Sequence, residues 1–288
     1  MRNMKIAIII LNYNSSADCE KCIRSLKRQE NQEIEIIVVD NCSEREDRCA
    51  VEQLCKKEGC TFIANNKNLG YNAGNNVGLR YAASKGYEYA MVANPDMEFP
   101  QSDFLQKMIA TIEMDKDIAV CGSDIVTPLG IHQNPKRVGE GKWQDSFSWV
   151  KDIFRKKNMT DVPDWIEAPE KSRYCQCLNG CCILLRMTLI KEMGYFDERT
   201  FLYGEEPILA RQVEMSGKKL YYDATAQAVH DHKKSKEGTP AYCSKHWKHS
   251  QILYIRHYSG YPIWGKIYAE LSTHLYFVAL NIYHKIRK

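Results

Sequence analysis

Residues 87–96 read Tyr-Glu-Tyr-Ala-Met-Val-Ala-Asn-Pro-Asp, a mainly apolar run that ends on the carboxylate of Asp96. A second apolar run, residues 33–39, is followed directly by Asp40 and Asn41. Both runs have the length and composition of strands. In an open α/β sheet, ligands bind outside the carboxyl ends of the strands. Two strands that each end on a carboxylate therefore predict a ligand site at that edge.

Strands and helices alternate over the first 120 residues. We predict strands at 5–11, 33–39, 60–64, 87–93 and 118–122. Helices are predicted between them, at about 16–28, 43–58, 72–85 and 101–115. This alternation is typical of an α/β fold in which helices cover both faces of a mostly parallel sheet.

The rest of the chain is organised differently. Residues 125–172 carry proline, glycine and tryptophan with weak periodicity, which predicts an insertion or a long loop. Further short strands are expected at 174–178 or somewhat later, at 218–222 and at 228–230, and closing helices at about 244–257 and 264–286. We therefore divide the chain into a first domain, residues 1–235, and a basic, aromatic helical extension, residues 236–288.

Composition restricts the class of protein. A chain of 288 residues with 44% hydrophobic residues forms a sizeable core, and its net charge of +4 is too small to indicate nucleic-acid binding. The apolar stretch at residues 6–11 is too short for a secretory signal, and no apolar run is long enough for a transmembrane helix. We expect a cytoplasmic protein with reduced thiols. The cysteines nearest to a zinc motif fit no common zinc spacing: Cys19, Cys22, Cys175, Cys177, Cys181 and Cys182.

Amide side chains and glycines follow three predicted strands and form a candidate donor-binding set: Asn12, Tyr13, Asn14, Asp40, Asn41, Asn68, Gly70, Asn72 and Gly74. A carboxylate such as Asp40 accepts from the ring N–H of uracil or thymine, and nearby amides reach the ring carbonyls and the ribose. The glycines let the backbone approach a diphosphate, and the next helix offers free N–H groups to it. The alternative is that Asp40 caps a turn and that the asparagines make turn hydrogen bonds.

A cation site is predicted from Asn94, Asp96 and His230. One carboxylate, one imidazole and the phosphate oxygens of a donor form a suitable ligand set for Mg²⁺ or Mn²⁺. His232 competes with His230 for this role. Three lysines that follow would stabilise a departing diphosphate: Lys233, Lys234 and Lys236.

Two adjacent carboxylates, Glu205 and Glu206, precede Pro207 at the start of a predicted helix. Proline is favoured in the first turn of a helix, and the N-terminus of the helix favours an ionised carboxylate. An ionised carboxylate at the edge of a pocket is suited to act as the general base for a sugar hydroxyl. The alternative is that both acids simply complement the helix dipole.

Taken together, these motifs resemble those of the family-2 inverting glycosyltransferases, especially the bacterial rhamnosyl- and galactofuranosyl-transferase-like branch that builds surface polysaccharides. The resemblance runs from about Lys5 to Ser235 and rests on residues 10–14, 38–43, 68–76, 94–96, 201–206 and His230. It implies a GT-A fold, with a Rossmann-like sheet, and a nucleotide-sugar donor. It also implies that Asp40 contacts the base, Asp96 and His230 hold the metal, and Glu206 is the catalytic base.

The chain departs from the family pattern at two positions. The metal motif of the family usually has two aspartates, whereas the first is Asn94 here. One carboxylate is lost, and the expected affinity for metal is lower. The acid pair is usually Glu-Asp, but here it is Glu205 and Glu206, which leaves the choice of base between them open.

The function that we expect is transfer of a sugar from a UDP- or dTDP-sugar to a hydroxyl of a glycan or lipid-linked acceptor in surface polysaccharide synthesis. Tryptophans in the 125–172 segment supply either an aromatic acceptor surface or ordinary packing: Trp143, Trp149 and Trp165. A nucleotidyltransferase is the alternative, but it would carry a basic, glycine-rich loop near the N-terminus, and residues 11–16 contain no Gly, Lys or Arg. A non-catalytic nucleotide-sugar binding protein is a third hypothesis.

The last predicted helix has an apolar face formed by Trp264, Ile267, Tyr268, Leu271, Leu275, Val278 and Ile282. Lys266, Lys285, Arg287 and Lys288 lie near its ends. This pattern predicts a helix at an anionic membrane surface, at the inner face of the plasma membrane. The alternatives are packing on the chain itself or a homodimer through the C-terminal helices.

Overall fold

The computed structural model describes residues 5–30, 33–136, 142–152, 166, 168–232 and 240–286. The strands are β1 (Lys5–Asn12), β2 (Glu33–Asp40), β3 (Thr61–Ala64), β4 (Tyr89–Ala93), β5 (Met97–Glu98), β6 (Ile118–Val126), β7 (Arg173–Cys175), β8 (Cys182–Arg186) and β9 (Lys219–His230). The helices are α1 (Ser16–Leu26), α2 (Arg45–Glu58), α3 (Tyr71–Ser84), α4 (Phe104–Ile112), η1 (Trp143–Phe147, a 3₁₀ helix), α5 (Trp149–Asp152), α6 (Met187–Glu192), α7 (Glu205–Met215), α8 (Pro240–His257) and α9 (Ile263–Ile286).

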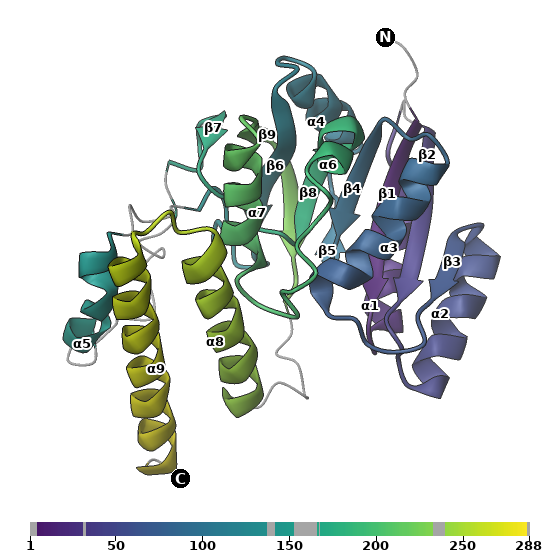
Figure 1. Cartoon of the computed structure of the whole chain (residues 1–288). Coiled ribbons are helices and arrows are strands. Elements are labelled where there is room, and N and C mark those ends of the chain that lie inside the picture. The colour runs from purple at the N-terminus through teal and green to yellow at the C-terminus, as the bar shows by residue number, and fades with distance from the viewer. Residues whose placement is uncertain are drawn as a thin grey trace.

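These strands form one mixed sheet in the order β3-β2-β1-β4-β8-β6-β9-β5, with β7 paired to β9 (Figure 1). The first four strands of the chain pair in parallel, and so do β6 and β9. β8 lies antiparallel between β4 and β6, so β6 and β9 run in the same direction as the first four strands. The predicted α/β alternation and mostly parallel sheet are confirmed.

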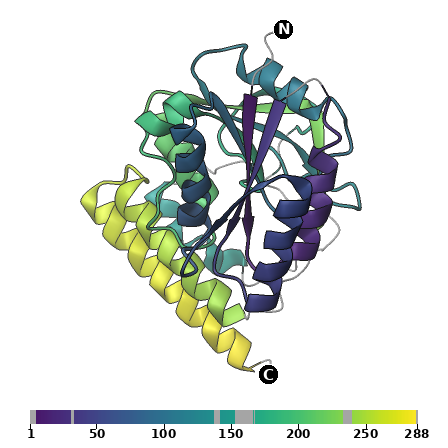
Figure 2. The ribbon, with the colours of Figure 1, turned by 90° about the vertical axis from the view of Figure 1, so that its right-hand side faces the viewer.

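Helices cover both faces of the sheet, as expected (Figure 2). In β1, Ile6, Ile8 and Ile10 pack with residues of α1, α2 and α4, whereas Ala7 and Ile9 pack with residues of α3, α6 and α7. Because both faces of the central strands are buried, their sequences are continuously apolar rather than alternating.

The carboxyl ends of several strands meet at one edge of the sheet. Asn12 at the end of β1 is paired in register with Asp40 at the end of β2. The short β5 pairs antiparallel with the end of β9, which brings Met97 opposite His230. This pairing places Asp96 beside the histidines, although more than a hundred residues separate them in the chain.

The second half of the sheet differs from the prediction in three ways. β7 covers only the first two residues of the strand expected at 174–178, and β8 lies at the somewhat later position that the prediction also allowed. The two strands expected at 218–222 and 228–230 are one strand, β9, which continues through an irregularity in its pairing with β6. The two-residue β5 was not foreseen, because two residues are too few to show a periodic pattern.

The C-terminal helices α8 and α9 lie side by side at one end of the sheet, and α9 extends beyond its carboxyl edge (Figure 1). A small apolar cluster of Ile208, Leu253 and Tyr258 joins α8 to α7. No helix in the described ranges is long and apolar enough to cross a membrane.

Candidate active site

Asp96, His230 and His232 form one cluster at the carboxyl edge. Their candidate ligand atoms all lie within 4.8 Å of one another, and this is the only such group of His, Cys, Asp or Glu side chains among the described residues. Asp96 Oδ1 lies 3.3 Å from His230 Nε2, and Oδ2 lies 3.4 Å from His232 Nδ1. His230 and His232, which were predicted as alternatives, therefore both contact the carboxylate of Asp96.

The contacts of this cluster fit a divalent cation. Asp96 Oδ1 and His230 Nε2 are buried and have no hydrogen-bond partner, which is costly unless another ligand satisfies them. His230 Nδ1 lies 2.8 Å from the Gln133 side-chain oxygen. If Nδ1 donates its proton there, the neutral ring directs the lone pair of Nε2 towards Asp96, as in metal-ligating histidines.

Electrostatics favour the ionised carboxylate of Asp96. Burial opposes ionisation, but the adjacent imidazoles of His230 and His232, when they carry a proton on the nitrogen that faces Asp96, outweigh it and hold the pKa of Asp96 well below its usual range. The hydrogen bond with Asp96 raises the pKa of His232. Asn94 lies beside this cluster, and its backbone N–H donates to Cys181 O at 2.8 Å.

Asn12 and Asp40 lie at the end of the parallel strands and are fully buried. The amide nitrogen of Asn12 donates to Asp40 Oδ1 at 3.0 Å and to Asp47 Oδ2 at 2.9 Å. Asp40 Oδ2 accepts from the backbone of Ser43 at 3.2 Å, so the turn-capping alternative describes its contacts. Both oxygens of this buried carboxylate are in use, and its contact with a base stays a prediction.

The loop before α3 is held by Asn41. Its amide nitrogen donates to Asn68 Oδ1 at 2.9 Å and to Gly70 O at 3.1 Å, and its oxygen accepts from the backbone of Leu69 at 3.0 Å. Asn14 bonds the turn after β2 in a similar way, through Glu44 N at 2.8 Å. Tyr13, in contrast, is exposed at this edge.

The two loop glycines are packing positions. A Cβ on Gly70, whose φ is +81°, would lie 2.4 Å from Phe201 O, and one on Gly74 would lie 2.6 Å from the Leu11 side chain. The first N–H group of α3, on Tyr71, donates to Phe201 O at 2.7 Å. The space and the N–H group that were predicted to receive a diphosphate are therefore filled by the chain itself.

Glu205 and Glu206 begin α7 in different environments. Glu206 Oε1 accepts from Lys136 Nζ at 2.6 Å. Burial, and then the charge of Glu206, raise the pKa of Glu205 to about 7, and Glu205 Oε2 is buried without a hydrogen-bond partner. Although burial lowers the pKa of Lys136, the Glu206 carboxylate more than compensates and raises it.

Two loop segments lie between the Glu205–Glu206 pair and the cluster of Asp96, His230 and His232. Residues 133–136 reach His230 through Gln133 and Glu206 through Lys136. Residues 179–181 contact Asn94 through Cys181 O, and Tyr71 donates to Gly180 O at 2.7 Å. Sequence reasoning missed Gln133 and Lys136, because isolated polar residues in a loop carry no periodic or motif signal, and it gave no separate role to Tyr71 of the 68–76 motif.

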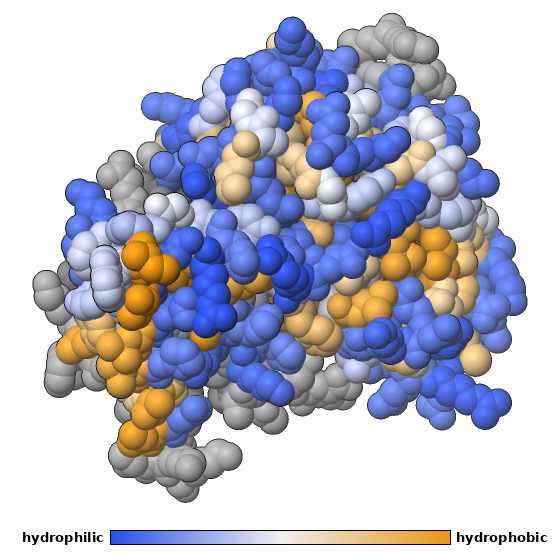
Figure 3. Space-filling model, in the orientation of Figure 1, coloured by the Kyte–Doolittle hydropathy of each residue, from blue (hydrophilic) through white to orange (hydrophobic). Residues whose placement is uncertain are grey.

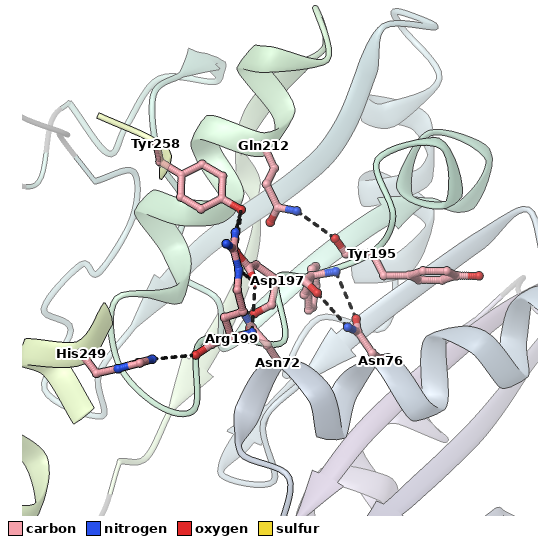
Figure 4. Close-up of polar contacts among 9 residues, drawn as sticks. Asn72, Asn76, Tyr195, Asp197, Arg199, Gln212, His249 and Tyr258 are labelled. Carbon is pink, nitrogen blue, oxygen red and sulfur yellow. Dashed lines mark hydrogen bonds and ion pairs between the residues drawn. The ribbon is translucent and has the colours of Figure 1, made fainter. Parts of the chain in front are cut away.

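A polar network fixes the chain segment that leads into the carboxylate pair (Figure 4). The backbone oxygen of Asp197 accepts from Asn72 at 2.9 Å, and its carboxylate accepts from Tyr258 at 2.6 Å and pairs with Arg199 at 2.7 Å. His249 of α8 lies 3.1 Å from Arg199 O. Asn72, a predicted donor contact, is buried and instead binds this segment.

The cysteines form no metal group among the described residues. The eleven whose side chains are described are free thiols. Trp143 and Trp149 pack on α9: a Cβ on Gly265 would lie 2.7 Å from Trp143, and Trp149 donates to Ser272 Oγ at 2.8 Å. Packing is thus the correct alternative for these two tryptophans, while Trp165 lies outside the described residues.

The strand order and the polar carboxyl edge of the sheet can be compared with solved structures. The structure superposes on a mannosyltransferase from Pyrobaculum calidifontis, solved in complex with GDP-Man and Mn²⁺, with a TM-score of 0.60. The two share 17% sequence identity, and the match covers 94% of this chain and 69% of the other. The fold is therefore the GT-A fold.

Sequence comparison then defines the family. The family model described as Glycosyl transferase family 2 matches residues 7–167, more than half of the chain, and the chain belongs to this family. A low-salt glycan biosynthesis hexosyltransferase of Haloferax volcanii is 28% identical over 202 residues, which are 70% of this chain and 59% of that relative's length. An N-acetylglucosaminyl-diphospho-decaprenol L-rhamnosyltransferase of Mycobacterium tuberculosis is 23% identical over 267 residues, 89% of this chain and 86% of the relative.

Proposed function

We propose that this chain transfers a sugar from a nucleoside-diphosphate sugar to an acceptor hydroxyl, with inversion at the anomeric carbon. The observation that carries the proposal is the connection of two groups at the carboxyl edge. The Asp96 cluster, suited to a cation and a diphosphate, is joined through residues 133–136 to the carboxylate of Glu206, suited to a base. Family membership supports the same conclusion.

The donor would lie across the ends of β1, β2 and β4. Asp40 would accept from the ring N–H of uracil or thymine, and the exposed Tyr13 would flank the nucleoside. Asn12 and Asn41 act as positioning residues in this proposal, because their amides are already used to hold Asp40 and the 65–70 loop. Gly70, Gly74 and Asn72 shape the helix behind the site.

Asp96, His230 and His232 would together hold Mg²⁺ or Mn²⁺. His232 offers an additional ligand, which would replace the carboxylate that the family usually has at the position of Asn94. A divalent ion bound there would neutralise charge on the departing diphosphate. The proposal places Gln133 behind His230, where it fixes the ring orientation.

Glu206 is the proposed base. Its ion pair with Lys136 keeps the carboxylate in one position, and the acceptor hydroxyl would give its proton to the second carboxylate oxygen. The acceptor oxygen then attacks the anomeric carbon from the face opposite the diphosphate. Glu205, with a pKa of about 7, is the competing candidate, because a base works best when its pKa lies near the working pH.

The acceptor class is proposed as a glycan or a lipid-linked glycan in surface polysaccharide synthesis. The support is the mycobacterial relative, a rhamnosyltransferase for N-acetylglucosaminyl-diphospho-decaprenol. For such an acceptor we predict that the protein works in the cytoplasm, at the inner face of the membrane.

The test is a transfer assay with UDP- and dTDP-sugars, combined with calorimetric titration of donor with and without Mn²⁺. Asp96→Ala should lose the metal-dependent part of donor binding. Glu206→Gln should keep donor binding and lower turnover by about 10²–10⁴, the usual contribution of general-base catalysis. Full turnover in Glu206→Gln with loss in Glu205→Gln would transfer the role to Glu205.

The same assay separates the other two hypotheses. A nucleotidyltransferase would release pyrophosphate from a nucleoside triphosphate and a sugar phosphate. A non-catalytic binding protein would bind the donor, yet it would neither transfer nor hydrolyse the sugar with any acceptor. Either result would contradict the proposed reaction.

A further inference from the structure

Helix α9 has an unusual orientation on the molecule, because its most apolar side faces outward. Seven large apolar side chains are between 44% and 76% exposed: Ile263, Trp264, Ile267, Leu271, Leu275, Val278 and Ile282. All but Ile263 recur at intervals of three or four residues and form one stripe, here called the outward face. The space-filling view shows apolar residues gathered along this helix (Figure 3).

The packing of the opposite side fixes this orientation. Gly265 lies against Trp143, where a Cβ would come within 2.7 Å, and Ser272 accepts from Trp149. Further along, Phe277 packs against Trp247 of α8, with ring centroids 5.4 Å apart. Small residues and specific aromatic contacts therefore hold the inner side, and a rotation of α9 that hid the outward face would break them.

Charge around α9 identifies the occupant. From Lys233 to Lys288 the sequence has ten Lys and Arg residues but only two Asp and Glu residues, a net charge of +8. The whole chain carries +4, so residues 1–232 carry −4. The acid within α9, Glu270, is already paired with Arg256 at 2.7 Å. An apolar stripe in a basic segment is the pattern of a helix that lies in an anionic membrane interface.

We infer that the outward face of α9 docks on an anionic lipid bilayer, with the helix axis in the plane of the membrane. The stripe from Trp264 to Ile282 is ~27 Å long at 1.5 Å per residue. A second copy of the chain is the less suitable occupant, because a symmetric contact would bring two strongly basic segments together. The carboxyl edge of the sheet and the free end of α9 lie on the same side of the molecule (Figure 1).

The test uses the full-length protein without donor or acceptor, so its outcome is independent of the proposed reaction. The protein is sedimented with vesicles of phosphatidylcholine alone and with equimolar phosphatidylcholine and phosphatidylglycerol. We expect binding to the anionic vesicles that weakens in about 1 M salt, where the Debye length is ~3 Å. The double variant Leu271→Glu, Leu275→Glu should lower the partition coefficient at least about a hundredfold, since two leucines that would be buried in the bilayer are lost and two charges that anionic lipid repels are gained.

The matched control is Met114→Glu, Met215→Glu. These methionines are exposed at the ends of α4 and α7, and the control makes the same change in net charge and in apolar surface away from α9. It should retain binding to within about threefold, which is about half of the free-energy change that a tenfold loss of binding represents. Circular dichroism should show unchanged folding in both variants, because all four positions are exposed.

A second readout places the contact on α9. Brominated lipid should quench Trp264 fluorescence, and the quenching should fall in Trp264→Phe. Quenching that is unchanged in Trp264→Phe would overturn the inference. So would equal loss of binding in the control, or absence of binding to the anionic vesicles. A solution dimer that Leu271→Glu, Leu275→Glu dissociates would then identify a second copy of the chain as the occupant.

Discussion

At the scale of single residues, Glu205 and Glu206 show how adjacent side chains acquire different chemistry. Glu206 is paired with Lys136, whereas Glu205 is enclosed and its pKa is raised to about 7. Burial penalises the charged form of Glu205, and the neighbouring carboxylate adds to that penalty. The pair therefore offers one carboxylate held by a cation and one acid that is largely protonated below neutral pH.

The raised pKa of Glu205 predicts a pH-dependent effect of Glu205→Gln on stability. The folded state binds more protons than the unfolded state between pH 4.5, the ordinary pKa, and about 7, so stability is lost as pH rises through this window. Glutamine stays neutral and avoids the loss. We expect Glu205→Gln to stabilise the protein by roughly 2 kcal/mol more at pH 8 than at pH 4. Thermal melts at both pH values check this, and an equal effect at both would contradict it.

Lys136 is predicted to act through Glu206. Lys136→Met should lower kcat by about tenfold or more while donor affinity changes little, and Lys136→Arg should restore much of the rate because it keeps a cation at this position. A double-mutant cycle supplies the control. If Lys136 acts through Glu206, Lys136→Met should cost little further activity in the Glu206→Gln background. Additive losses would instead indicate a separate role for Lys136.

At the scale of elements, the loop before α3 depends on Gly70. Its backbone has φ +81° and ψ −177°, and the Phe201 carbonyl occupies the place of a side chain. This contact ties the start of α3 to the segment that precedes Glu205. The helix N-terminus is thus part of the framework that joins the donor edge to the carboxylate pair.

Gly70→Ala should destabilise the protein by about 3 kcal/mol, because backbone strain adds to a clash with backbone atoms. Gly59→Ala is the matched control, since Gly59 has φ +66° but no atom within 4 Å of the position that a Cβ would take. It should cost only about 1 kcal/mol. Chemical denaturation measures both values. Similar losses in the two variants would show that strain alone, and not the contact with Phe201, matters at Gly70.

At the scale of the whole molecule, the α8–α9 pair is attached to the sheet by side chains far apart in sequence. Leu253 and Tyr258 pack on Ile208 of α7, and Tyr258 also donates to Asp197. These contacts link the C-terminal helices to the segment that positions the carboxylate pair. The boundary placed at residue 235 from the sequence stays a prediction, and cooperative unfolding is the property that tests it.

Leu253→Ala should destabilise the fold by about 2–4 kcal/mol, because it leaves a cavity between α7 and α8. If the helices and the sheet unfold together, calorimetry should show one transition that moves to lower temperature. Leu275→Ala is the control: this leucine is exposed on α9 and should change stability by less than about 0.5 kcal/mol. Two separate transitions, with only one shifted by Leu253→Ala, would support an independent C-terminal domain.

The alternation of helices with the longer strands, the polar strand ends and the apolar stripe of α9 could be read from the sequence, whereas the short β5 and the continuity of β9 could not. Local periodicity and strand-end polar residues carry that information, because they depend on residues close together in the chain. The same local signals predicted a site at Asp96 and His230, which the structure brings together. Only the tertiary structure revealed the pairing of Lys136 with Glu206, the support of His230 by Gln133, and the use of Gly70 for packing against Phe201. Those contacts join loops that lie dozens of residues apart, and the order and register of the sheet strands decide which loops meet. The sequence alone likewise left open whether the stripe of α9 faces inward or outward, since the aromatic contacts on its other side determine that orientation.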